Sequence, residues 1–189
     1  MNISRGLLVG IALIFWGCPS SQQDDDDSAQ EGPADSVEYY YGDSFATLPG
    51  APEGQETVST YLVRRSLFPG QSRITEELIP TGGGEHYLVT MEVDAEAATL
   101  ELEFQDGSYT GTGTLIGPPW AWTGWQTQST STVDGSTVTS TDVLGETALI
   151  VDKVVRDPAG NPVLLLHEEF EVMSQSAWQE IHDQVPAGR

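Results

Sequence analysis

Few residues in this 189-residue chain have the types and spacing that catalysis or metal binding requires. Its three histidines, His86, His167 and His182, lie far apart in the sequence. The segment "HEEFE" from His167 shares only its first two letters with the zinc-peptidase motif, and it is typical of a strand rather than the helix which that motif needs. Paired acids such as Glu168 and Glu169 suit a glycosidase, but a chain with 29 acids contains such pairs by chance. We therefore predict no catalytic residue, no metal ligand and no cofactor, and keep a carboxylate-dependent hydrolase as an alternative.

A tryptophan-rich stretch, "GPPWAWTGW" at residues 117–125, is a candidate ligand-binding wall. Trp120 and Trp122 are two residues apart, so in a strand they share one face. Trp125 falls on the opposite face unless Gly124 forms a bulge. The tryptophans either fill a core, because each ring buries a large area, or line a cavity for an apolar ligand.

Two adjacent arginines in "YLVRRSLF", Arg64 and Arg65, complete this candidate wall. Neighbouring residues of a strand point to opposite faces, so one of the two points inward. A buried arginine needs a carboxylate partner. That partner is either an acid of the chain, which we favour, or the carboxylate of a ligand.

The single cysteine, Cys18, follows a segment typical of a secretory signal. Arg5 and the amino terminus are positive, and Gly6 to Gly17 is an uncharged, mostly apolar run of twelve residues. At about 1.5 Å per residue this run is too short to cross a hydrocarbon core about 30 Å thick. A positive start and a short apolar stretch mark a signal peptide, which we place at residues 1–17.

Gly17 and Cys18 resemble the lipobox of bacterial lipoproteins, with Phe15 and Trp16 where that motif usually has Leu and a small residue. The resemblance implies cleavage before Cys18, acylation of its thiol and anchoring of the chain in a membrane. Several acyl chains together hold a protein firmly, whereas one alone holds it weakly. Pro19 stands where Asp would favour inner-membrane retention, so we expect the outer membrane of the cell envelope. An ordinary signal or an uncleaved anchor with an incidental cysteine is the alternative.

An acidic, polar segment follows the cysteine. Residues 19–63 contain no Lys or Arg and ten acids, with many Ser, Gln, Gly and Pro. Such a composition favours an extended, disordered chain, so we predict a tether over residues 18–56. The stretch "VEYYYGDSFATLP" at 37–49 interrupts it. We interpret this stretch as a short arm that packs onto the domain, or as a contact patch for a partner.

The net charge of −22 excludes whole classes of partner. Nucleic-acid binding depends on Lys and Arg at the phosphates, and the chain has seven of these residues against 29 acids. The expected partners are the membrane, through lipidated Cys18, and either an apolar small molecule or another envelope protein.

From residue 57 onward the pattern alternates with period two. In "TLELEF", Leu100, Leu102 and Phe104 share one face and polar residues share the other, which indicates a half-buried strand. Short turn-rich links make neighbouring strands antiparallel. "VDGS" predicts a type I′ hairpin at Asp134 and Gly135. The expected strands are 57–68, 71–80, 85–93, 98–105, 108–116, 120–132, 136–144, 147–156 and 163–173.

The last segment changes to a helical period. Trp178, Ile181, His182 and Val185 share one face of a helix, with Ser174 or Ser176 as its cap. The fold class is therefore mainly β. About nine meandering antiparallel strands form a barrel or a strongly curved sheet, and one C-terminal helix follows, within a domain over 57–189.

This layout resembles small lipocalin-like barrels, while an open sheet with the helix in its concavity and a β-sandwich are rivals. We expect a lipid-anchored envelope protein that is a binding or structural module rather than an enzyme, with a carrier of an apolar ligand as the alternative.

Overall fold

The computed structural model of the protein describes residues 34, 36–52, 54–68, 72–118 and 121–186, all within a compact unit, Gly32–Arg189. The predicted signal peptide, Cys18 and the tether up to residue 33 lie outside the described residues, as does Trp120.

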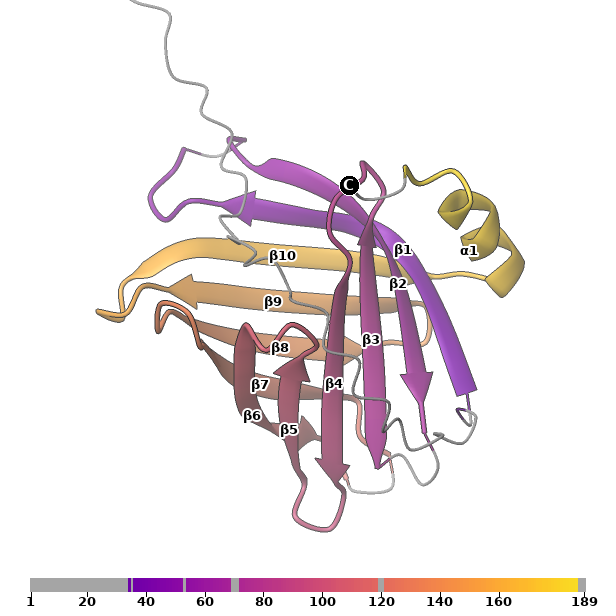
Figure 1. Ribbon diagram of the computed structural model, residues 1–189, viewed down its shortest axis with the longest axis horizontal. Coiled ribbons are helices and arrows are strands. Elements are labelled where there is room, and N and C mark those ends of the chain that lie inside the picture. Colours follow the sequence, from indigo (N-terminus) through magenta and orange to yellow (C-terminus); the bar gives the residue numbers. More distant parts are fainter. Residues whose placement is uncertain (1–33, 35, 53, 69–71, 119–120, 187–189) are drawn as a thin grey trace, which may run out of the picture. The chain divides into compact units, whose positions relative to one another are not determined.

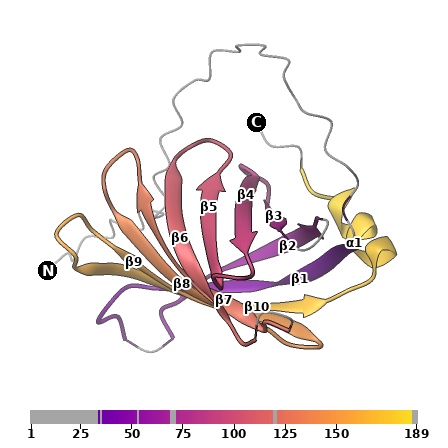
Figure 2. The same cartoon turned by 90° about the horizontal axis from the view of Figure 1, so that it is seen from below.

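Ten antiparallel strands form a closed barrel in which nearly every strand pairs with its neighbours in the sequence (Figures 1 and 2). The nine strands expected from residue 57 onward are confirmed, as is the barrel itself. The strands are β1 (Ser36–Thr47), β2 (Thr57–Leu67), β3 (Arg73–Pro80), β4 (Tyr87–Asp94), β5 (Thr99–Phe104), β6 (Tyr109–Ile116), β7 (Gly124–Ser131), β8 (Thr137–Leu144), β9 (Ala148–Arg156) and β10 (Pro162–Val172).

The tenth strand, β1, corrects the domain boundary expected from the sequence. The composition predicts a tether over residues 36–47, but they form the strand that pairs with both β2 and β10 and so closes the barrel. Gly42 allows the close approach of β1 to β10, because a Cβ at this position would collide with the carbonyl of Glu169. The pairing of β1 with β10 also excludes the open sheet as a rival.

Apolar side chains that face inward form two clusters in the barrel. One contains Ile74, Met91, Leu100, Leu102, Leu115 and Trp125, and the other contains Tyr40, Val63, Leu149, Val151 and Phe170. Most of these positions alternate along their strands with exposed or half-buried residues. The period-two pattern of the sequence therefore follows from burial of one face of each strand.

The link between β7 and β8 differs from the predicted type I′ turn. That turn needs positive φ at both central residues, but Gly135 has φ 75° and Asp134 is not among the residues with positive φ. The carboxylate of Asp134 instead accepts hydrogen bonds from the backbone N–H and hydroxyl of Ser136, at 2.9 and 2.7 Å. This side-chain capping stabilises a wider loop over residues 132–136.

Helix α1 (Gln175–His182) lies outside the barrel (Figure 2). Ser174 caps it by accepting a hydrogen bond from the N–H of Ala177. Trp178 is buried against Leu62 and Ile79, two residues on the outer faces of β2 and β3. The helix thus covers an apolar patch on the outer surface instead of filling the interior. Within the described residues, no helix is long and apolar enough to span a bilayer.

Candidate functional site

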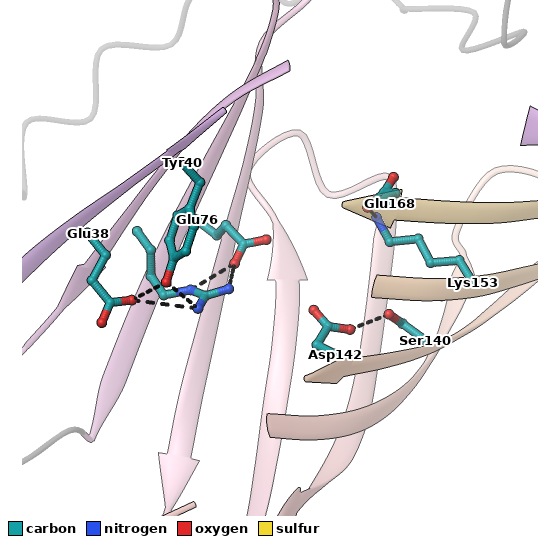
Figure 3. Close-up of polar contacts among 8 residues, drawn as sticks. Glu38, Tyr40, Glu76, Ser140, Asp142, Lys153 and Glu168 are labelled. Atoms are coloured by element: carbon teal, nitrogen blue, oxygen red, sulfur yellow. Dashed lines mark hydrogen bonds and ion pairs between the residues drawn. The ribbon is translucent and has the colours of Figure 1, made fainter. Parts of the chain in front are cut away.

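Charged side chains point into the barrel from several strands (Figure 3). Most of them are in phase with buried apolar residues of their own strand. The buried or largely buried members are Arg65 on β2, Glu76 on β3, Asp142 on β8, Lys153 on β9 and Glu168 on β10. An interior with charges at these positions is not the plain apolar cavity that the tryptophans suggested.

Inside the barrel, the side chain of Arg65 contacts a carboxylate and two aromatic rings. Its side chain is only 1% exposed, and Nη2 lies 2.7 Å from Oε2 of Glu76. The guanidinium also lies over two rings, 4.9 Å from the centroid of Trp125 and 5.4 Å from that of Tyr40. Such cation–π contacts and the ion pair together offset the cost of burying the charge. The carboxylate partner is therefore a residue of the chain, and Glu38 at 3.7 Å adds a second, more distant acid.

Lys153 and Glu168 form a second internal ion pair, between β9 and β10. The ammonium donates to Oε2 of Glu168 at 2.8 Å, and the hydroxyl of Ser44 donates to Oε1 at 3.1 Å. Burial alone would lower the pKa of Lys153, but the negative charges of Glu168 and Asp142 outweigh it and raise that pKa. The Lys153 side chain is 25% exposed although it faces inward, so solvent reaches this part of the barrel.

Asp142 differs from the other two inward carboxylates. Among the described residues its direct polar partner is the hydroxyl of Ser140, and it forms no ion pair there. Burial, together with the negative charge of Glu76, raises the pKa of Asp142 from 3.8 to about 6. Glu76 and Glu168 are each bonded to a cation. Asp142, with a pKa of about 6, can exchange a proton close to neutral pH.

Of the two remaining predicted wall residues that the structure describes, Arg64 lies apart from this interior, whereas Trp122 packs against one of its apolar clusters. Arg64 points outward, 48% exposed, and pairs with Glu77 at 2.8 Å. Trp122 precedes β7 instead of lying in it, and its ring is 5.7 Å from that of Trp125. The predicted strand 120–132 begins too early, because β7 starts at Gly124. Trp122 therefore lies in the link before the strand, where its ring is next to that of the buried Trp125. The chain brings Arg65, Trp122 and Trp125 into one region, whereas Arg64 is on the other side of the sheet.

The outer face of β5, β6, β7 and β8 carries a second polar region. The strand registers align its outward residues in three rows that cross the strands. All twelve are Thr, Gln or Glu, so the three rows contain no apolar and no cationic side chain. The first row is Thr99, Thr114, Gln126 and Thr141, the second is Glu101, Thr112, Gln128 and Thr139, and the third is Glu103, Thr110, Thr130 and Thr137.

A groove of about 720 Å³ runs between the first two rows, and we call it the cross-strand groove. Its walls are the eight side chains of those rows, and its floor is the backbone of Leu100, Gly113, Thr127 and Ser140. A parallel hollow of about 470 Å³ lies on the β4 side and shares Glu101 and Thr112 with it.

The wall side chains of the cross-strand groove keep their hydrogen-bonding capacity free within the described part of the chain. None of the eight forms a side-chain hydrogen bond or ion pair there. Other threonines do: Thr60 donates to Asp43 and Thr132 donates to the carbonyl of Gly107. The groove therefore presents hydroxyl, amide and carboxylate groups that only solvent or a ligand can satisfy.

Sequence reasoning predicted one inward arginine with an acidic partner, but it missed Asp142, Lys153 and the outer rows, although each leaves a signal. Lys153 and Asp142 stand at positions of their strands where the alternation places the inward side chains. A charged residue at such a position indicates a polar group inside the barrel. "TGTGTL", "QTQSTS" and "TVTSTDV" show Thr or Gln at every second position. Strand pairing alone reveals that these positions align in rows.

Comparisons with known proteins add no identity to this geometry. No protein-family model matches the chain, and no curated protein matches its sequence. Among the described residues, no group of three or more His, Cys, Asp and Glu side chains is arranged to hold a metal ion.

Proposed function

We propose that this protein is a lipid-anchored lipoprotein of the cell envelope whose barrel is a binding module. The proposed anchor is Cys18, supported by the preceding short apolar run and Gly17. The acidic composition of residues 19–33 suits a tether between a membrane and the barrel.

The cross-strand groove is the observation that carries the binding role. Its eight wall side chains have no partner within the described residues, whereas Arg65 and Lys153 inside the barrel are bonded to acids. Because the cationic side chains inside the barrel are paired with acids of the chain, the interior acts as a rigid scaffold. A groove whose hydroxyl, amide and carboxylate groups are free to donate and accept hydrogen bonds gives this scaffold a surface for a polar partner.

Palmitate labelling and fractionation test the anchor. We expect radioactive palmitate to label the wild type and Ser20→Ala, which keeps the cysteine and serves as the matched control. Cys18→Ala should lose the label, accumulate as a larger precursor and leave the outer-membrane fraction. Equal labelling of Cys18→Ala and the wild type would reject lipid attachment at this residue.

A second candidate function, a carrier of an amphipathic ligand inside the barrel, is supported by the exposure of Lys153 and by the Trp122–Trp125 pair. A fatty acid has both an apolar chain for the rings and a carboxylate for the ammonium. Titrating the mature protein with a fatty acid, while recording tryptophan emission, tests this role. Saturable binding that Trp122→Ala weakens would support a carrier, and an unchanged emission spectrum would reject it.

A further inference from the structure

The chemistry of the cross-strand groove restricts what can occupy it. The protein carries a net charge of −22 and the groove has no Lys or Arg in its walls, so anionic chains are repelled. Its walls present five Thr hydroxyl groups, two Gln amide groups and one carboxylate, that of Glu101. Such walls hold groups that both donate and accept hydrogen bonds.

The shape of the groove favours an extended occupant. The two walls are two residues apart along each strand, or about 6.6 Å, and the groove crosses four strands spaced about 4.8 Å apart. A chain that lies across the strands meets a polar side chain on each side at every strand. Thr methyl groups between the hydroxyls provide small apolar contacts, and the Glu101 carboxylate accepts strong hydrogen bonds from hydroxyl donors.

A peptide or a protein surface fits this groove poorly. The floor is backbone whose N–H and C=O groups already belong to the paired ladders of the barrel, so it cannot add a further strand. The walls also lack the aromatic and aliphatic anchors that dominate protein–protein contacts.

An ice surface, which would need a flat plane of hydroxyl groups on the protein, also fits this face poorly. Adjacent strands of a sheet are rotated by roughly 20–25°, and the longer Gln126 and Gln128 side chains interrupt the threonine rows. The hollowed, twisted face is therefore better matched to a flexible chain than to a flat crystal surface.

We infer that the cross-strand groove binds an extended, uncharged polyhydroxylated chain, that is, a neutral glycan. This inference rests on the proposed role of the barrel as a binding module and specifies the class of its ligand. Hydroxyl groups on both edges of a sugar chain meet the two walls, and the absence of charge avoids the repulsion that an acidic polysaccharide would meet.

The test uses the mature chain without its signal and four uncharged probes: cellohexaose, laminarihexaose, maltohexaose and chitohexaose. We expect at least one of them to produce saturable chemical-shift changes, in two-dimensional NMR spectra, confined to β5, β6, β7 and β8. Oligogalacturonate, an anionic chain of similar size, should bind more weakly than the best neutral probe.

Paired variants locate the site. Thr112→Val with Thr139→Val removes two hydroxyls from one wall and keeps the side-chain shape, so the melting temperature should not change while affinity falls by about tenfold. Thr112→Ser with Thr139→Ser keeps the hydroxyls and should bind nearly as well as the wild type. Thr75→Val, on the outer face of β3 away from the groove, is the matched control and should leave affinity unchanged.

Several results would overturn the inference. These are no saturable binding of any neutral probe, shifts that map to the barrel interior, or equal binding by the valine double variant. Ice shaping by the wild type in the absence of sugar binding would assign the rows to ice instead. If sugars fail to bind but palmitate labels Cys18, the glycan inference is wrong and the proposed lipid anchor stands.

Discussion

Arg65 donates from Nε and Nη2 to the same carboxylate oxygen of Glu76, at 3.0 and 2.7 Å, inside the barrel. Directly beside it on β2, Arg64 makes an equally short ion pair with Glu77, at 2.8 Å, on the outer face. The two pairs occupy successive positions of the same two strands. They differ in exposure, which is 1% for the Arg65 side chain and 48% for that of Arg64.

This matched arrangement predicts very different mutational costs. Arg65→Met leaves the Glu76 charge buried without its partner and should lower the free energy of unfolding by about 3–5 kcal/mol. Arg64→Met, the control, should change it by no more than about 1 kcal/mol because water screens the outer pair. Urea unfolding of both variants measures the difference. Equal losses would show that burial does not set the strength of these pairs.

Asp142 predicts a specific dependence of stability on pH. Its pKa in the folded protein is raised to about 6 from 3.8, mainly by burial. The folded state therefore binds more protons than the unfolded state between about pH 4 and 6, so the contribution of Asp142 to stability falls as pH rises through this window. Asp142→Asn should remove that loss and be more stable than the wild type at pH 7 by roughly 2–3 kcal/mol.

Thermal unfolding of the wild type and Asp142→Asn from pH 3.5 to 7.5 measures this effect. The difference in stability between the two proteins isolates Asp142, because titration of the other acids affects both proteins equally. Ser140→Ala provides a second check, because its hydroxyl bonds to the carboxylate and lowers the pKa of Asp142. A difference between the wild type and Asp142→Asn that stays constant over the whole range would contradict the raised pKa.

The closure of the barrel by β1 predicts which truncations can fold. A chain that begins at Thr57 lacks β1 and leaves the edges of β2 and β10 unpaired, so it should lose cooperative unfolding and aggregate. A chain that begins at Gly32 retains the strand and should fold. Circular dichroism with thermal melting compares the two. A peptide of residues 36–47, added to the shorter chain, should restore some of the β signal.

The packing of α1 against the barrel predicts that replacing one aromatic residue strongly lowers the free energy of unfolding. Trp178 is 3% exposed and packs on Leu62 and Ile79, which are themselves almost fully buried. Trp178→Ala should lower the free energy of unfolding by about 3–5 kcal/mol and increase the binding of a hydrophobic dye. Gln175→Ala, at the exposed start of the same helix, is the control. An unchanged melting temperature for Trp178→Ala would mean that the helix is not held by this contact.

The strand β1 could not be recognised as a strand from the sequence. Tyr39, Tyr40 and Tyr41 are consecutive, so no alternation appears. The structure supplies the reason, since Tyr39 packs against Trp178 on the outer side while Tyr40 belongs to the interior cluster. A strand that is covered on both faces shows no period of two, and its acidic neighbours give it the composition of a tether.

Nine of the ten strands, their antiparallel order and the terminal helix were predictable from the sequence. Alternation such as that of Leu100, Leu102 and Phe104 reports burial of one face, and short links with turn residues allow only neighbouring antiparallel pairing. The sequence also gives the net charge of −22, on which the prediction of no nucleic-acid partner rests. The strands and the helix depend on residues close together in the chain, and the net charge depends on composition alone.

Which residues of neighbouring strands lie side by side follows from the three-dimensional fold and not from the sequence pattern. Alternation shows that one of Arg64 and Arg65 points inward, but the pairing of β2 with β3 selects Glu76 as the partner of Arg65. The same holds for the cross-strand groove, whose rows combine residues from four strands. The relative register of strands depends on hydrogen bonds between segments distant in the chain. A sequence pattern records the face of each residue but not its neighbour on the next strand.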